Sequence, residues 1–214
     1  MKLYLLCLVF FILISSCSTL NKKPTKAYLK ANPSMPIKIN GTSATPKQST
    51  EFHSLIKSDA DTLAIEVAST YVYFPFGIIK GKTNPNLHLL KNFKITNEII
   101  KTDIGDIDLQ ILKHGSSKLI FFFNPAYSGK ESDLYKGEIY DTDVKFINGI
   151  KIGMSIDDFY KCFFDYFPSN LKNKYKYFVV EAVDGIKHTY SFKNDTLKSV
   201  KFSTGTYWKL VGNP

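Results

Sequence analysis

The spacing of apolar and polar residues along the chain predicts a fold built mainly of β-strands. Between Thr62 and Val67, the apolar residues Leu63, Ile65 and Val67 alternate with other side chains, as in a strand with one buried face. Three further β-rich runs cover residues 71–79, 138–147 and 175–183. These runs alone predict a sheet of several strands.

One hairpin has a predicted register. Its two strands carry apolar residues of one parity, namely Ile107, Leu109 and Ile111, then Leu119, Phe121 and Phe123. A three-residue loop at 114–116 pairs 111 with 119, 109 with 121 and 107 with 123. All six side chains then lie on one face of the sheet.

A second hairpin joins residues 187–193 to 197–204 around Asn194-Asp195-Thr196. Its register pairs His188 with Phe202 and Tyr190 with Val200. The two pairs lie on the same side of the predicted sheet.

Residues 155–167 carry the clearest helical pattern. Ser155 precedes Asp157 and Asp158, which is typical of an N-cap with acids in the first turn, and Pro168 ends the segment. The apolar residues at helical spacing are Ile156, Phe159, Tyr160, Phe163 and Phe167. Such a stripe is typical of a helix that faces a core.

Weaker signals complete the prediction. A short helix is expected over 49–58, loops over 81–86 and 124–137, and residues 87–100 fit neither period. The segment 205–214, which contains the only tryptophan, Trp208, is expected to pack on the sheet or cap an open edge. The predicted fold class is α+β, an antiparallel β-meander sheet with one main amphipathic helix packed on it.

The first residues have the pattern of a secretory signal peptide. Lys2 precedes an apolar run, Leu3 to Ile14, which is shorter than the roughly 20 residues that span a bilayer as a helix. The run ends in Ile14-Ser15-Ser16-Cys17. The alternative interpretation is an ordinary cleaved signal in which Cys17 is incidental.

The tetrapeptide resembles the lipobox of bacterial lipoproteins. The resemblance implies cleavage between Ser16 and Cys17, a diacylglyceryl group on the Cys17 sulfur and an acyl chain such as palmitate on the new N-terminus. Several acyl chains, each buried CH₂ contributing about 0.8 kcal/mol, anchor a protein to a membrane stably. The expected location is the cell membrane, lipid-anchored, at the outer membrane or the periplasmic face.

Three regions are therefore predicted: a lipoprotein signal peptide at 1–16, a lipidated tether at 17–48 and a single α+β domain at 49–214. The tether is rich in Lys, Pro, Ser, Thr and Asn, and its prolines favour an extended, solvated backbone. Within it, Ile37 and Ile39 could instead form a short edge strand.

The charge and the type of basic residue indicate which classes of binding partner to expect. The formal net charge is +9, and every basic residue is lysine. Proteins that recognise phosphates or base edges rely on the planar fork of arginine, so a nucleic-acid partner is not expected. Scattered lysines indicate a solvated, mildly basic surface, with attraction to anionic lipid or acidic polysaccharide as the alternative.

After processing, Cys162 is the remaining cysteine, so no disulfide within the chain is expected. Residues 149–204 resemble the module of β-lactamase-inhibitor-like and small outer-membrane-assembly lipoproteins. The resemblance is carried by Gly153-Met154-Ser155 before the acidic turn, by Tyr190-Ser191-Phe192 and by Leu197-Lys198-Ser199-Val200. It implies a helix on a sheet and a protein that binds other proteins without catalysis.

Candidate chemistry is sparse. Cys162 and His188 could form a thiol and base, and Asp103, Asp106 and Asp108 have a spacing that could serve Ca²⁺. A half-buried structural thiol and a turn followed by strand acids are the alternatives. The other histidines, His53, His88 and His114, are isolated in sequence. No catalytic residue, metal site or cofactor is therefore predicted.

The first functional hypothesis is a membrane-anchored, non-enzymatic domain that binds an envelope protein or another envelope component. The second is a carrier or sensor that holds an apolar ligand between helix and sheet. It is suggested by aromatic residues at Phe121, Phe122, Phe123, Phe163 and Phe164. The third is an enzyme whose site no sequence pattern reveals.

Overall fold

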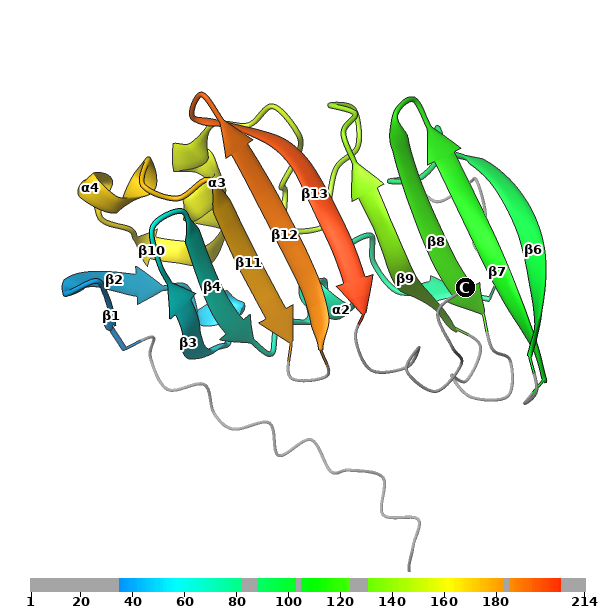
Figure 1. Ribbon diagram of the computed structural model, residues 1–214, viewed down its shortest axis with the longest axis horizontal. Coiled ribbons are helices and arrows are strands. Elements are labelled where there is room, and N and C mark those ends of the chain that lie inside the picture. Colours follow the sequence, from blue (N-terminus) through cyan, green and yellow to red (C-terminus); the bar gives the residue numbers. More distant parts are fainter. Residues whose placement is uncertain (1–34, 82–87, 103–104, 124–130, 183–184, 205–214) are drawn as a thin grey trace, which may run out of the picture. The chain divides into compact units, whose positions relative to one another are not determined.

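Two β-sheets contain most of the elements (Figure 1). The computed structural model describes residues 35–81, 88–102, 105–123, 131–182 and 185–204. In chain order, the elements are β1 (Ile37–Ile39), β2 (Thr42–Pro46), the 3₁₀ turn η1 (Gln48–Thr50), β3 (Phe52–Ser58), β4 (Thr62–Val67), α2 (Thr70–Tyr73), β5 (Ile79–Lys80), β6 (Lys94–Thr102), β7 (Gly105–His114), β8 (Ser117–Phe123), β9 (Glu131–Ile139), α3 (Ile156–Phe163), β10 (Phe164–Tyr166), α4 (Ser169–Lys172), β11 (Tyr177–Ala182), β12 (Ile186–Lys193) and β13 (Thr196–Thr204).

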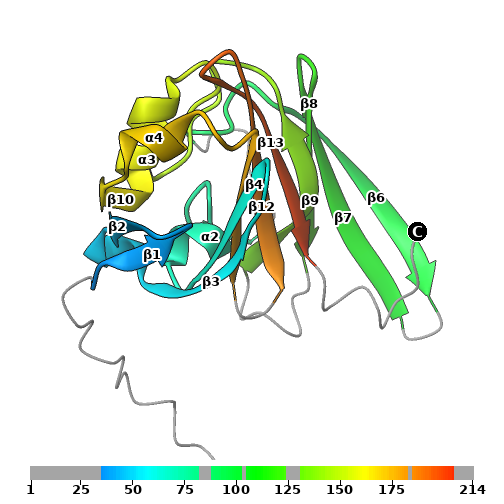
Figure 2. The same ribbon diagram turned by 60° about the vertical axis from the view of Figure 1, so that its left-hand side comes forward.

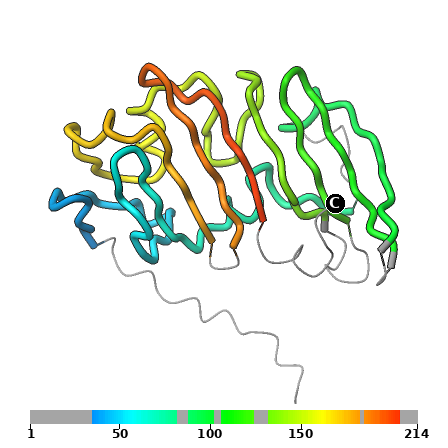
Figure 3. The backbone as a smooth tube through the Cα atoms, viewed as in Figure 1, coloured from blue at the N-terminus to red at the C-terminus, as the bar shows by residue number. Residues whose placement is uncertain are grey.

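The larger sheet has the strand order β3-β4-β11-β12-β13-β9-β8-β7-β6, and β5 pairs with β9. Its strands pair antiparallel except for β4 and β11, which run parallel side by side although more than a hundred residues separate them (Figure 3). The fold is therefore a sheet-dominated α+β fold. The sheet is mixed, which corrects the prediction of a purely antiparallel one.

β1, β2 and β10 form the smaller sheet. Ile39 and Ala44 are fully buried in it, and Phe164 of β10 pairs with Pro46. Residues 37–46 are therefore part of the folded structure, as in the alternative of a short strand at Ile37 and Ile39. The expectation of a solvated tether up to residue 48 is wrong for this stretch, because Ile39 and Ala44 are buried and Ile37 is partly buried.

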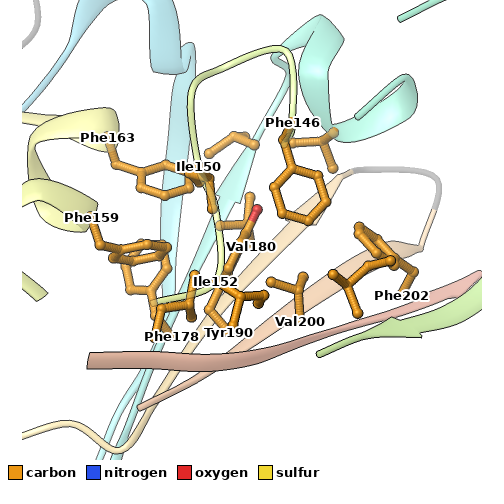
Figure 4. Packing of buried hydrophobic residues seen from close by; sticks show 14 of the residues in the cluster. Phe146, Ile150, Ile152, Phe159, Phe163, Phe178, Val180, Tyr190, Val200 and Phe202 are labelled. Atoms are coloured by element: carbon orange, nitrogen blue, oxygen red, sulfur yellow. The ribbon is translucent and has the colours of Figure 1, made fainter. Parts of the chain in front are cut away.

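The described helices lie on one face of the larger sheet, called the inner face here (Figure 2). Between helix and sheet, aromatic rings form the main core. Figure 4 shows the side chains of Phe159, Phe178 and Tyr190 in this core. The Phe159 ring lies 5.4 Å from that of Phe178, 4.9 Å from that of Tyr190 and 4.8 Å from that of Phe192, centroid to centroid. Burial of such rings is the largest favourable contribution to folding that this part of the chain offers.

α3 begins as predicted. The Ser155 hydroxyl oxygen accepts a hydrogen bond from the backbone N–H of Asp158 at 3.1 Å, and Asp157 and Asp158 occupy the first turn. The helix ends at Phe163 and not at Phe167. The Phe163 carbonyl accepts bonds from the Lys47 N–H at 2.8 Å and the Thr50 hydroxyl at 2.7 Å, so the chain leaves the helix to pair with β2.

Replacing Ser155 by alanine is expected to lower the free energy of unfolding by about 0.5–2 kcal/mol, because the first turn of α3 loses its capping acceptor. Urea denaturation followed by circular dichroism measures the change. Ser155→Asp keeps an acceptor at the cap and is the matched control. Equal losses in both variants would contradict a capping role.

The hairpin of β7 and β8 differs from the prediction by one residue. Its turn has two residues, Gly115 and Ser116, so Leu112 pairs with Leu119 and Leu109 with Phe122. A slip of one residue exchanges the faces of a strand. Leu119 and Phe121 consequently belong to the main core, whereas Ile107 and Leu109 lie on the opposite, outer face.

The hairpin of β12 and β13 has the predicted pairs. His188 pairs with Phe202 and Tyr190 with Val200. The turn itself is tighter than predicted, because Asn194 and Asp195 both have positive φ and Lys193 pairs with Thr196. A register shift between Ser191 and Phe192 restores the predicted pairing beyond the turn.

Two local predictions are wrong in element type. Residues 49–58 form the end of η1 and strand β3 in place of a helix. A register shift in β3 lets Phe52 and Leu55, three residues apart, pair with Val67 and Ile65, which are two residues apart on β4. The apolar residues of a strand with such shifts can therefore have the spacing that is typical of a helix. Residues 71–79 contain the one-turn helix α2 and only the start of β5. The run predicted at 175–183 contains strand β11, which begins at Tyr177, two residues later than predicted.

β9 occupies residues 131–137 of the loop predicted over 124–137, so that part of the prediction is wrong, whereas residues 124–130 lie outside the described residues. The strand predicted over 138–147 is present only as far as Ile139. β9 contains Gly137, a residue typical of loops, for a structural reason. A Cβ on Gly137 would lie 2.6 Å from the Lys118 carbonyl oxygen, so β8 and β9 pair closely there only with glycine. The loop predicted at 81–86 and the segment 205–214 lie outside the described residues, apart from Gly81.

Candidate binding surface

The predicted lipidation site, Ser16 and Cys17, lies outside the described residues. Within the described part of the chain, every helix is too short or too polar to cross a membrane. Membrane attachment through Cys17 therefore stays a prediction.

Cys162 and His188 make separate contacts. The Cys162 thiol, half-buried near the end of α3, donates to the Asp158 carbonyl oxygen at 3.4 Å. His188, buried on β12, has its Nδ1 atom 3.3 Å from the Tyr190 hydroxyl oxygen. Burial raises the pKa of the Cys162 thiol and lowers the pKa of His188 to about 3. Near pH 7 both groups are therefore uncharged, and the geometry does not favour a thiolate nucleophile.

The tyrosines of the core are held uncharged in the same way. Burial raises the pKa values of Tyr71, Tyr160 and Tyr190 well above the ordinary value. The Tyr160 ring is stacked on Phe167 with centroids 3.8 Å apart, which places it in the packing of the core. These side chains stabilise the fold by burial, as apolar rings do.

The three aspartates considered as calcium ligands do not form a site within the described residues. Asp106 and Asp108 lie on strand β7, while Asp103 falls outside the described ranges. Across those ranges, no group of three or more His, Cys, Asp or Glu side chains is placed to hold a metal ion. His53 is exposed on β3 and His88 is exposed before β6.

A polar cluster that the sequence did not indicate lies at the turn between β7 and β8. The Asp141 carboxylate accepts hydrogen bonds from the backbone N–H of Ser117 at 2.9 Å and of Ser116 at 3.1 Å. His114 Nε2 lies 2.9 Å from Asp143, which lowers the pKa of the Asp143 carboxyl. These contacts link the hairpin turn of β7 and β8 to the segment that follows β9.

The outer face of β11, β12 and β13, as far as Glu138 on the neighbouring strand β9, is polar. Lys187 pairs with Glu181 at 3.0 Å, and Lys201 pairs with Glu138 at 3.5 Å, each across neighbouring strands. Such exposed pairs contribute at most about 1 kcal/mol each to stability. They make this half of the outer face charged.

The outer face of β6 to β9 is apolar instead. It carries the outer apolar cluster, defined here as Ile107, Leu109, Ile120, Phe122 and Tyr135. Ile100 and Ile111 pack against it. In this half, the sheet therefore has apolar residues on both faces. In the observed register of β7 and β8, Leu119 and Phe121 lie on the inner face, and Ile107 and Leu109 lie on the outer face.

The two edges of the larger sheet differ. At one edge, β3 is broken by two register shifts, which is a common protection against further pairing. At the other, β6 pairs with β7 through nine residues in unbroken register, from Lys94 to Thr102. Ile99 on β6 exposes 63% of its surface. β6 is therefore a long, regular edge that an extended segment can join.

No family model matches the chain, and neither the curated proteins nor the solved structures contain a match to it.

Proposed function

We propose that this chain is a lipid-anchored lipoprotein of the bacterial envelope, a non-enzymatic domain that binds another envelope protein. The motif Ile14-Ser15-Ser16-Cys17 and the Pro-rich residues behind it support the anchor. The half-buried Cys162 thiol donates to the Asp158 carbonyl oxygen and the buried His188 ring contacts the Tyr190 hydroxyl, so these contacts do not support a thiol–base pair.

The edge strand β6 is the observation that carries the binding role. Among the strands of the described residues, β6 has β7 as its one neighbour, so its other side offers backbone N–H and C=O groups to an added strand. Lys94, Glu98 and Lys101 alternate in charge along it. An extended segment of an envelope protein fits this edge, since main-chain bonds supply affinity and side chains supply specificity.

The finer architecture is part of the proposal. We infer that β11, β12 and β13 form a meander on which α3 is the main amphipathic helix, as in the lipoprotein module that residues 149–204 resemble. Gly153-Met154-Ser155 directly precedes α3, Tyr190 and Phe192 lie on β12, and Val200 lies on β13. Members of that module act by binding proteins, which supports the same role here.

The anchor is tested by expressing the chain with a radioactive fatty acid. The wild-type chain is expected to take up the label and to partition with membranes, because Cys17 carries the diacylglyceryl group. Cys17→Ser is expected to lose both, while Cys162→Ser, which leaves the lipobox intact, keeps both. Unlabelled wild-type protein in the cytosol would refute the anchor.

The binding edge is tested with a photo-crosslinking amino acid at position 99, compared with position 56. Ile99 lies on β6, and Ile56, 49% exposed, lies on the bulged edge strand β3. In whole cells, a specific protein adduct is expected from position 99 and not from position 56. Adducts from neither position, or equal adducts from both, would contradict docking on β6.

The ligand-carrier alternative requires free volume between helix and sheet. The rings of Phe159, Phe163 and Phe178 pack there with centroids 5.0–5.4 Å apart. Phe122, part of the aromatic group that suggested the carrier, lies on the outer face. These contacts favour the protein-binding proposal.

A further inference from the structure

The outer apolar cluster is buried on a face that the described helices do not cover. None of its five residues exposes more than 9% of its surface, and Leu109 exposes 4%. The described helices lie on the inner face instead (Figure 2). Side chains on an open sheet face remain partly accessible, so exposures this low require a covering segment.

The end of β13 lies directly beside this cluster. The Thr204 hydroxyl donates to the carbonyl oxygen of Tyr135, a member of the cluster, at 3.0 Å. β13 pairs with β9, which forms the near border of the apolar half of the sheet. The chain that follows Thr204 therefore starts at the border of the cluster.

The segment 205–214 has the length and composition to cover it. From β9 to β7, the cluster spans two inter-strand steps of about 4.8 Å, whereas ten extended residues reach about 33 Å. The segment contains Tyr207, Trp208, Leu210 and Val211. Its one charged residue is Lys209, so most of its side chains suit an apolar face.

We propose that residues 205–214 dock on the outer apolar cluster, with Trp208 as the anchoring side chain. Docked there, the segment covers the outer apolar cluster and leaves the ion pair of Glu181 and Lys187 uncovered. The inference does not depend on the lipid anchor or on docking at β6.

Trp208 is the only tryptophan, so its fluorescence reports this segment alone. In the full chain, solubilised in detergent, its emission is expected at shorter wavelength and with weaker acrylamide quenching than in the same chain in denaturant. The signal is expected to be independent of protein concentration. Emission equal to that of the denatured chain would overturn the proposal, as would burial that appears only at high concentration, which would indicate a second copy.

Two neighbouring residues of β8 give a matched pair of variants. Phe122 lies in the outer cluster and Phe121 in the main core, so they point to opposite faces. Phe122→Leu is expected to shift the Trp208 emission to longer wavelength, and Phe121→Leu to leave it unchanged. The reverse pattern would overturn the proposal.

A photo-crosslinking amino acid at position 208 provides a measurement on the otherwise unaltered chain. Mass spectrometry is expected to find it joined to peptides of the same molecule from 105–123 or 131–139. Joining to another copy, to a different protein or to the inner-face elements would refute the docking.

Discussion

Replacing Phe159 by alanine is expected to lower the free energy of unfolding by about 3–5 kcal/mol, the usual cost of removing a buried aromatic ring. Phe159 is fully buried, and its ring contacts those of Phe163, Phe178, Tyr190 and Phe192 at 4.8–5.4 Å. The loss combines the transfer energy of the ring with the cavity left between α3 and the sheet. Such a change is a large part of the stability of a typical domain.

Urea denaturation with linear extrapolation measures this loss. The matched control is Tyr166→Ala, which removes an aromatic ring of similar size that is 57% exposed on β10. The control is expected to change stability by no more than about 0.5 kcal/mol. Similar losses from both variants would mean that Phe159 does not lie at the centre of the core.

His188 is expected to make the fold less stable in mild acid. Its pKa is lowered by burial from 6.5 to about 3, so the folded chain keeps the ring neutral while the unfolded chain protonates it. The contribution is fully present above pH 6.5 and is lost as the pH falls from there towards 3. In that window the loss is about 1.4 kcal/mol per pH unit.

The measurement is the free energy of unfolding at several pH values between 7 and 5. His188→Phe is expected to give a flatter profile than the wild type, since phenylalanine fits a site beside Phe202 and cannot be protonated. His53→Gln, at an exposed position, is expected to keep the wild-type slope. A wild-type slope in His188→Phe would show that another group causes the acid sensitivity.

The two hairpins show when the local hydrophobic pattern is sufficient to predict the register of a strand pair. In β12 and β13, apolar residues such as Tyr190 and Val200 occupy the inner face and polar ones the outer face, so one register is favoured. In β7 and β8, neighbours such as Phe121 and Phe122 are both apolar and both buried, on opposite faces. A hydrophobic pattern without alternation does not distinguish two registers, and the tight turn at Gly115 decided between them.

The sequence indicates the candidate lipidation site, but it does not indicate the edge strand β6 or the polar cluster at Asp141 and Asp143. The lipobox motif depends on four adjacent residues and can be read locally, whereas the edge strand β6 falls in a stretch that fits neither period. An edge is a property of the assembled sheet, since it depends on which strands lack a second neighbour. The cluster around Asp141 and Asp143 likewise depends on contacts with residues more than twenty positions away.

By itself, the amino-acid sequence determined a strand-rich fold, the start of α3 at Ser155 and the pairing of His188 with Phe202. It also predicts a lipid anchor at Cys17. These features arise from side chains close together in the chain. The tertiary structure alone decided that α3 ends at Phe163, that β4 runs parallel to β11 and that β7 and β8 bury both faces. Each depends on backbone or packing partners distant in sequence, which local periodicity does not encode.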